Sequence, residues 1–319
     1  MYRIGVDLGG TNIAVGVVSE DLKIVGRGKV KTKCPRPAEE IFDDIALAVD
    51  MAMKDAGITM DEVSSVGVGT PGSVNKSNGY IEFANNLDFN KVPAKDMLEE
   101  RLGKKEIYID NDANCAALGE AVAGVGKGVG NFVAVTLGTG VGSGVIIGGK
   151  MLTGCAHGGA EIGHTVIVKD GRPCTCGRQG CFEVYCSATA LISETKKKFE
   201  QCPDSLMREM CGGDVNRVGG KTAFAAMRKG DKAATEVVNE YLGYLACGIA
   251  NIINVFQPEV LCIGGGVSGE KENLLRPLIP LIEKEIYTKD KKLRTDIRIA
   301  ELGNDAGIIG AAFLGRSMQ

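Results

Sequence analysis

The 319-residue sequence has only two histidines and nine prolines, and it has no long apolar run. No apolar stretch approaches the roughly 20 residues of a membrane-spanning helix, which excludes that class of protein. The formal net charge is −3 with both signs interspersed, which argues against a nucleic-acid-binding or membrane-binding face. The opening MYRIGVDLGG has the pattern of a strand rather than of a signal peptide. The scarcity of proline argues against a low-complexity chain.

Glycine and cysteine, in contrast, are plentiful. The 45 glycines cluster at the ends of predicted strands, where a backbone turns sharply or approaches a ligand. Eleven cysteines without a secretory signal indicate a reducing cytoplasm, and eight of them, such as Cys115, Cys247 and Cys262, stand alone in apolar surroundings typical of a core. At 44% hydrophobic residues, the chain is long enough for two domains with a core each.

The other three cysteines and one histidine form a compact cluster in the segment from Glu161 to Glu183. Its four candidate ligands are His164, Cys174, Cys176 and Cys181. Three thiolates and one imidazole complete the tetrahedral shell of a structural zinc site and leave no open position for a catalytic water. The alternative is a set of simply buried cysteines, but three within eight residues of a non-secreted chain favour zinc. Acidic side chains flank the cluster, so we expect the metal to order a substrate-binding loop.

Two glycine turns share one pattern. Residues 7–18, DLGGTNIAVGVV, and residues 136–147, TLGTGVGSGVII, each have the order strand, glycine turn, strand. Main-chain N–H groups in such turns can bind an anion, although an ordinary glycine-containing hairpin is an equally good interpretation of the first one. Neither turn has the GxxxxGK[ST] pattern of a P-loop. The repetition predicts two related α/β lobes that face each other across a cleft.

Strands and helices alternate along the rest of the chain. The patterns predict three strands over residues 2–30, helices at 38–56, 187–200 and 231–254, and a loop at 201–221. Asp112 follows the strand EIYID, at a strand-to-helix junction where open α/β sheets present side chains to ligands. Asp112 is therefore a candidate catalytic base, but capping of the helix is the plainer role of Asn111 and Asp112.

The motifs GVDLGGTN, NDANCAALGE, LGTGVGSG, the ExGH of Glu161 to His164 and CTCGRQGCFE, taken in order, resemble the ROK family of sugar kinases and regulators, and its bacterial glucokinase branch in particular. The resemblance covers residues 4 to 315. It implies a two-lobed actin-like, ribonuclease-H-like fold with a structural zinc loop, as in sugar kinases, Hsp70 and actin. The implied lobes are 1–117 with 305–319, and 118–304. The implied reaction is transfer of the γ-phosphoryl group of ATP, with Mg²⁺, to glucose, which gives glucose 6-phosphate.

The resemblance also implies the residues of the site. Asp112 matches the family's catalytic aspartate, which changes the interpretation from cap to base. The positions that match sugar-binding residues are Gly72, Asn86, Asn111, Asp112, Glu161, His164 and Glu183, with Asn86 in altered surroundings. The positions that match nucleotide-binding residues are Asp7, Gly9, Gly10, Thr11, Gly138, Thr139, Gly140, Gly264, Gly265 and Gly266. The glycines from Gly264 to Gly266 can admit a flat ring, although a tight turn explains them equally well.

Other functions stay open at this point. The runner-up is a kinase of an N-acetylhexosamine or of another hexose, because the ExGH motif does not separate these. A sugar-sensing repressor of the same family would add an N-terminal helix-turn-helix, for which a first strand beginning at residue 2 leaves no room. A non-catalytic, zinc-stabilised sugar-binding protein would need neither the phosphate segments nor Asp112. The resemblance further implies a cytoplasmic homodimer that binds a sugar and a nucleotide, without nucleic-acid or membrane partners.

Overall fold

The structure, a computed structural model, describes residues 1–103, 105–287 and 294–317. Contacts along the chain divide it into two compact units. The first unit comprises Met1–Ala134, Gly144–Ala160 and Ala300–Gln319, and the second comprises Val135–Ser143 and Glu161–Ile299. Among the described residues no helix combines the length and the apolar character needed to span a bilayer.

The first unit is built on a five-stranded mixed sheet. Its strands are β1 (Tyr2–Leu8), β2 (Asn12–Val18), β3 (Ile24–Lys31), β4 (Val63–Thr70) and β8 (Glu106–Asn111), in the order β3-β2-β1-β4-β8. The pairs β3-β2 and β2-β1 are antiparallel, whereas β1-β4 and β4-β8 are parallel. The three strands predicted over residues 2–30 are confirmed. The parallel strands β1, β4 and β8 end at one edge of the sheet, which is the edge that carries the candidate site.

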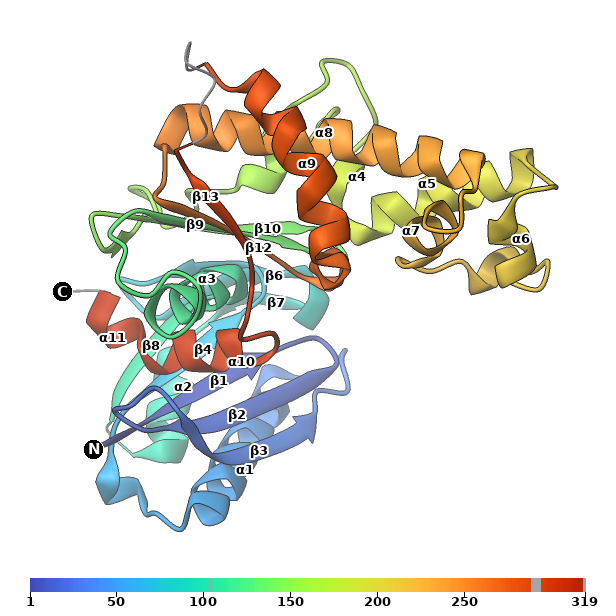
Figure 1. The fold of residues 1–319 in the computed structure, drawn as a ribbon. Helices are drawn as coiled ribbons and strands as arrows, with labels where there is room; N and C mark the ends of the chain where they lie inside the picture. The colour runs from blue at the N-terminus through green and yellow to red at the C-terminus, as the bar shows by residue number, and fades with distance from the viewer. Residues whose placement is uncertain (104, 288–293, 318–319) are drawn as a thin grey trace. The chain divides into compact units, whose positions relative to one another are not determined.

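Helices cover both faces of this sheet (Figure 1). One face carries α1 (Ala38–Ala56), which follows a short connection after β3, and α2 (Ala94–Leu102). The other face carries α3 (Asp112–Val122) and α10 (Asp305–Ala312). Helix α10 lies directly on the sheet backbone, because a Cβ atom at Gly5 would stand only 1.8 Å from the carbonyl oxygen of Ile308. The predicted helix 38–56 is confirmed, and it ends at Gly57 in the left-handed conformation, with φ of 68°.

A small antiparallel sheet follows β4 in the first unit. It consists of β5 (Ser73–Asn75), β6 (Tyr80–Ala84) and β7 (Phe89–Val92), and the 3₁₀ helix η2 (Asn85–Leu87) joins the last two. Ile81 and Leu87 are fully buried, so this small sheet packs into the core of the unit. The candidate sugar-binding Asn86 lies on η2.

A second five-stranded sheet repeats the connectivity of the first. Its strands are β9 (Phe132–Leu137), β10 (Val141–Ile147), β11 (Lys150–Met151), β12 (Val260–Gly264) and β13 (Asp296–Ile299), in the order β11-β10-β9-β12-β13. Counted along the chain, both sheets therefore have the order third, second, first, fourth, fifth strand. The α/β fold predicted from the sequence is confirmed, with two mixed sheets.

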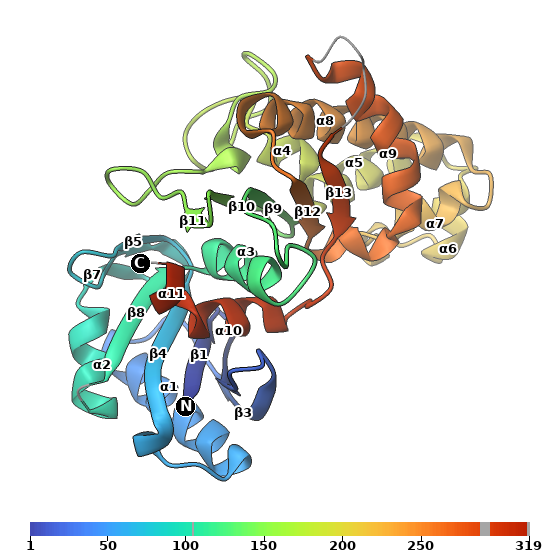
Figure 2. The same ribbon diagram turned by 60° about the vertical axis from the view of Figure 1, so that its left-hand side comes forward.

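The second unit is rich in helices. They are α4 (Glu183–Cys186), α5 (Ala188–Gln201), α6 (Leu206–Met210), α7 (Thr222–Met227), α8 (Lys232–Phe256) and α9 (Glu272–Glu285). Figure 2 shows α8 and α9 packed against each other beside β12 and β13. The apolar stripe predicted for residues 231–254 is buried on α8, from Ala234 to Ile253. The described residues also form the 3₁₀ helices η1 (Met60–Glu62), η3 (Ile162–His164), η4 (Val215–Arg217) and η5 (Gly266–Glu270) and the short helix α11 (Leu314–Ser317).

Three details differ from the sequence predictions. The segment 201–221 is not only a loop, because α6 and η4 form within it, each with an N-cap side chain, Ser205 and Asp214. Cys155 is exposed, so not all of the eight lone cysteines belong to a core. The predicted boundary after residue 117 falls inside α3, whereas the contacts keep that helix whole and place Gly144–Ala160 in the first unit. As a statement about functional lobes, 1–117 with 305–319 against 118–304 stays a prediction.

Candidate active site and metal centre

The start of α3 is the centre of the candidate site in the first unit. Asn111 caps this helix, since its side-chain oxygen accepts hydrogen bonds from the backbone N–H groups of Ala113 and Asn114. The Asn111 amide also donates to the carbonyl oxygen of Gly72 at 3.0 Å. The capping role that the sequence allowed to Asn111 and Asp112 alike thus belongs to Asn111. Asp112 is the first helical residue, and one of its carboxylate oxygens accepts the N–H of Ala113 at 2.8 Å.

A second carboxylate lies near Asp112. Asp7 is the next-to-last residue of β1, and α10 packs over it, so that a Cβ at Gly307 would stand 3.4 Å from the Asp7 carboxyl carbon. Burial, and then the negative charge of Asp112, raise the pKa of Asp7 from 3.8 to about 6. The end of β1 and the start of α3 therefore bring two acids into one negatively charged corner, which suits a cation or a proton in transfer.

The first glycine turn closes the β1-β2 hairpin beside η2. The N–H of Gly9 donates to the carbonyl oxygen of Asn12 at 3.0 Å, and the Thr32 hydroxyl donates to the carbonyl oxygen of Gly9 at 2.6 Å. A Cβ at Gly10 would be 3.4 Å from the carbonyl oxygen of Asn86, so the turn and the asparagine are neighbours. Asn12, which the sequence analysis did not single out, has a buried side-chain oxygen that lacks a hydrogen-bond partner within the described residues.

The second glycine turn joins β9 to β10 in the second unit. The N–H of Gly138 donates to the carbonyl oxygen of Gly140 at 3.0 Å, and nothing lies within 4 Å of a Cβ built at Gly138, so this side of the turn is open. Gly265, with φ of 81°, packs on the turn, because its Cβ would lie 2.6 Å from backbone atoms of Leu137. Close packing thus explains Gly265, whereas Gly266 borders open space. The two predicted nucleotide-binding segments of this unit are therefore adjacent.

Glu183 connects the second glycine turn to the cysteine cluster. Its Oε2 accepts the N–H of Val141 at 2.9 Å, and a Cβ at Gly140 would stand 2.2 Å from the same oxygen. Its Oε1 lies 3.9 Å from the Sγ of Cys174. Both carboxylate oxygens therefore have partners inside the unit, in addition to the sugar contact that the resemblance implies. Glu161 is exposed and immediately precedes η3, at whose end His164 lies.

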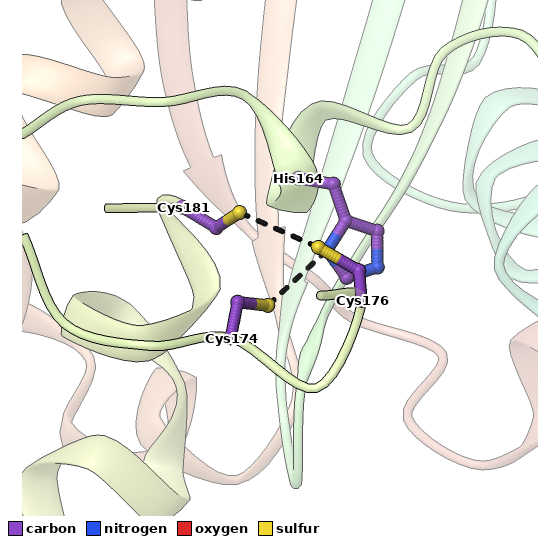
Figure 3. A group of neighbouring side chains, drawn as sticks. All are labelled: His164, Cys174, Cys176 and Cys181. Atoms are coloured by element: carbon purple, nitrogen blue, oxygen red, sulfur yellow. Dashed lines mark hydrogen bonds between the residues drawn. The ribbon is translucent and has the colours of Figure 1, made fainter. Parts of the chain in front are cut away.

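The structure brings all four predicted zinc ligands together (Figure 3). Their ligand atoms lie within 4.8 Å of one another. The Sγ atoms of Cys176 and Cys181 are 3.7 Å apart, as are the Sγ of Cys174 and the Nδ1 of His164. A tetrahedron with Zn–S bonds of about 2.3 Å has edges of about 3.8 Å, so these separations fit a zinc ion. The ligand set and its spacing therefore both suit zinc.

Short backbone hydrogen bonds shape the loop that carries these ligands. The N–H of Cys174 donates to the carbonyl oxygen of Arg178 at 2.8 Å, and Gly177 adopts φ of 85°, which favours glycine. The Arg178 guanidinium donates to the carbonyl oxygen of His164 at 3.1 Å, which links the cysteine-containing segment to the segment that carries His164.

Arg172 anchors the same loop to the helices of the second unit. Its guanidinium lies over the ring of Tyr185, 4.6 Å from the centroid, and its backbone N–H donates a hydrogen bond to the Tyr185 hydroxyl oxygen at 2.8 Å. An ion pair of 3.3 Å joins Arg172 to Glu194 on α5. This anchor could not be predicted from the sequence, because no local pattern relates an arginine in the loop to a tyrosine on α4.

The predicted site residues thus form two groups, one in each unit. The group in the first unit consists of Asp7, Gly9, Gly10, Thr11, Gly72, Asn86, Asn111 and Asp112. The group in the second unit consists of Gly138, Thr139, Gly140, Glu161, His164, Cys174, Cys176, Cys181, Glu183, Gly264, Gly265 and Gly266.

Comparison with known proteins gives consistent results along the whole chain. The family model described as "ROK family" matches residues 3–317. A glucokinase of Streptomyces coelicolor is 38% identical over 315 residues, which cover 98% of this chain and 97% of the relative, and a glucokinase of Thermotoga maritima is 38% identical over 312 residues, which cover 97% and 95%. Among solved structures, the ROK family glucokinase from Streptomyces griseus in complex with glucose and AMPPNP has a TM-score of 0.83 and 37% identity, with 99% of each chain covered.

Proposed function

Since the chain belongs to the ROK family, we propose that it is a glucokinase, which transfers the γ-phosphoryl group of ATP to glucose and yields glucose 6-phosphate. One observation carries this proposal. A relative with glucose and an ATP analogue bound is 37% identical to this chain and covers 99% of it, with a TM-score of 0.83. The structure of the start of α3 supports the same reaction, since it presents a carboxylate where a hydroxyl group could lose its proton.

Asp112 is the proposed general base. Phosphoryl transfer depends on positioning and on charge neutralisation, and the protein's chemical part is small: a carboxylate accepts the proton of the attacking hydroxyl group. Asp112 is suited to this because Asn111 performs the capping and holds the start of the helix against Gly72. The contribution of such a base is about 10² to 10⁴-fold in rate.

The remaining glucose hydroxyls need groups that accept and donate hydrogen bonds. We propose that Asn86 and Asn111 of the first unit and Glu161, His164 and Glu183 of the second provide them. The two asparagines can donate and accept, whereas the carboxylates accept. Gly72 would line the same pocket, since its carbonyl oxygen already receives the Asn111 amide. Because Glu183 also holds the turn at Val141, its sugar contact would couple glucose binding to the phosphate-binding turn.

The two glycine turns are the proposed sites for the phosphates of ATP. Gly9 and Gly138 close the two turns through their own N–H groups, and Gly10, Thr11, Thr139 and Gly140 provide backbone N–H groups that can face an anion. The open side of Gly138 and of Gly266 supports this assignment, with Gly264 to Gly266 beside the adenosine. Mg²⁺ would enter with ATP, since it binds mainly through substrate phosphates and water and few protein ligands. Asp7 would face this charged group from the end of β1.

Zinc is the proposed structural metal of the cysteine loop, with His164, Cys174, Cys176 and Cys181 as its ligands. The separations of 3.7 Å between ligand atoms support it. When bound, zinc would supply a rigid cross-link and no open coordination site, so it takes no part in phosphoryl transfer. Its use would be to fix the His164 ring, whose second nitrogen could then bind a sugar hydroxyl.

We also propose the finer features of the fold and of the cellular setting. The equal strand orders of the two sheets support the two lobes of an actin-like, ribonuclease-H-like fold. Eleven free cysteines support a reducing compartment such as the cytoplasm. A homodimer is expected, which sedimentation equilibrium at micromolar concentration would test.

The test of the proposed function is a coupled ATP-consumption assay across glucose, N-acetylglucosamine, N-acetylmannosamine, mannose, fructose and allose. We expect glucose to dominate and turnover to fall by about 10² to 10⁴-fold in Asp112→Asn. The dissociation constant for glucose, measured by calorimetry, should change far less, because the amide keeps the shape of the carboxylate.

If another sugar gave the highest turnover, the proposed substrate would change and the proposed mechanism would stand. Absence of turnover with every sugar would overturn the proposal in favour of a sugar-binding protein. A variant Asp112→Asn with full activity would remove Asp112 from the role of base.

A further inference from the structure

A buried carboxylate lies two residues before the proposed base in the chain. The Asp110 side chain is 3% exposed and has three partners. Its Oδ1 accepts the N–H of Asn111 at 2.8 Å and the side-chain amide of Asn114 at 2.9 Å, and its Oδ2 pairs with the ammonium group of Lys76. Asp110 thus fixes the backbone at Asn111 and, through Asn114, the first turn of α3. Asp112 lies between these two residues, so its position depends on both hydrogen bonds.

The partner of Asp110 comes from a different element. Lys76 lies in the turn between β5 and β6, and its side chain is only 11% exposed. Taking an ammonium group out of water is costly unless a carboxylate compensates its charge, and removal of one partner leaves the other buried and unpaired. The pair therefore joins the small sheet to the end of β8.

The two joined elements both carry proposed glucose-binding residues. Gly72 precedes β5, and Asn86 follows β6 on η2. Asn111 and Asp112 follow β8. The next residue of the same turn, Ser77, has its hydroxyl 3.2 Å from the Nε2 of His157, so that this turn has a second contact within the first unit.

We propose that Lys76 and Asp110 form a positioning pair, which fixes Asn111 and Asp112 against the small sheet and sets the electrostatic potential at the base. The proposal rests on the glucokinase function proposed above, and it adds a pair of residues that touch neither substrate. A purely structural role would require only that the two side chains hold each other in place. Because the two groups carry opposite charges, removing one or the other should also change the ease of Asp112 ionisation in opposite directions.

The charges in this corner do act on one another. For the fully buried thiol of Cys115, burial, then Asp110, Asp112 and Asp7 raise the pKa, and Lys76 lowers it. The remaining titratable groups on the elements packed against α3 are engaged elsewhere. Tyr108 donates to Glu106 on β8, Asp305 on α10 pairs with Arg27, and Glu120 on α3 accepts the N–H groups of Val125 and Leu302. Lys76 thus contributes a positive charge to this acidic corner.

The test compares Lys76→Met, Asp110→Asn and the double variant in the pH profile of kcat/KM for glucose. Loss of the Lys76 cation makes ionisation of Asp112 harder. The acid limb of the kcat/KM profile should therefore move to higher pH, by roughly half a pH unit to one unit, in Lys76→Met. Loss of the anion should move it down in Asp110→Asn, and the double variant should lie between them. We expect kcat to fall about tenfold or more in each single variant, because the base is displaced.

Matched controls exist in the same unit, since Lys95 and Glu99 form a half-exposed ion pair on α2. Lys95→Met and Glu99→Gln should leave the profile and kcat unchanged. The midpoint of the Asp112 carboxyl titration, followed by ¹³C NMR in the free protein, gives a readout that needs no turnover. It should move up in Lys76→Met and down in Asp110→Asn.

Shifts in the same direction, or no shift in either single variant, would overturn the positioning pair. The NMR titration separates this outcome from failure of the proposed function. If no sugar is phosphorylated by the wild-type chain, the function falls, whereas opposite carboxyl shifts would still support the electrostatic part of the inference.

Discussion

Neighbouring residues at the start of α3 have different roles although their side chains are similar in size and polarity. Asn111 satisfies two N–H groups of the first turn and bonds to Gly72, whereas Asp112 begins the helix. An N-terminal helical position also favours the ionised carboxylate, because the helix dipole is positive there. One residue thus provides the local stability that leaves the other available for chemistry.

Asp7 gives a prediction on stability. Its pKa of about 6, against 3.8 ordinarily, means that the folded chain holds this proton more tightly than the unfolded chain. The cost to folding is absent below pH 4, grows as the pH rises and is complete above about pH 6.5, where it reaches about 3 kcal/mol. Asp7→Asn removes this cost, so the free energy of unfolding of the variant at pH 8 should be higher by up to that amount. The rate of phosphoryl transfer should fall.

Urea unfolding of wild type and Asp7→Asn between pH 5 and pH 8 measures this difference. Asp61→Asn, at an acid in η1 for which no such burial applies, is the control and should show no pH-dependent gain. A constant difference between the two proteins across the pH range would contradict the raised pKa.

At the scale of elements, the proposed zinc ion would stabilise the cysteine loop more than apolar packing does. Its residues from Thr175 to Gln179 are exposed, so few side chains stabilise it by burial. Arg172 anchors its start on Tyr185 and Glu194, and the four ligands close its end. A loop of this kind is ordered by cross-links rather than by a core.

Replacement of Cys176 tests the role of the metal. This cysteine is exposed, so Cys176→Ala leaves no buried cavity, and any large effect must come from the lost ligand. We expect the variant to lose zinc and to bind glucose at least tenfold more weakly, because the loop carrying His164 becomes disordered. Zinc content by mass spectrometry and glucose affinity by calorimetry measure the two effects.

Cys155→Ala removes another exposed cysteine and serves as the matched control, with zinc content and glucose affinity unchanged. Normal glucose affinity in a zinc-free Cys176→Ala protein would show that the metal does not support sugar recognition.

At the scale of the whole molecule, the proposed glucose-binding residues belong to both units. Asn86 lies in the first and Glu161 in the second, and both are exposed, so their replacement should not disturb a core. If each binds glucose, Asn86→Ala and Glu161→Ala should both reduce the glucose-induced rise in Tm. A lost hydrogen bond of about 1–3 kcal/mol corresponds to roughly 5- to 150-fold in affinity.

Thermal unfolding at several glucose concentrations measures this stabilisation, since a ligand that binds only the folded chain raises Tm with concentration. Asn85→Ala, at the exposed neighbour of Asn86, should behave as wild type. An unchanged response in one of the two variants would remove that residue from the proposed glucose site.

The sequence by itself determined the features that depend on local pattern. Strand and helix periodicity predicted β1 to β3, α1 and the buried stripe of α8, because side-chain burial repeats with the period of each element. The spacing of His164, Cys174, Cys176 and Cys181 predicted their cluster, since a short loop brings such ligands together whatever the rest of the fold. The motifs also indicated the family.

The tertiary structure decided the features that join distant segments. Only the fold buries Asp7 and places it beside Asp112, which together raise the pKa of Asp7 to about 6. Only the fold pairs Lys76 with Asp110 across 34 positions. Only the fold packs Gly265 on Leu137 and gives the capping role to Asn111 rather than to Asp112. The physical reason is the same in each case: burial, charge and close approach depend on partners that chain order does not specify.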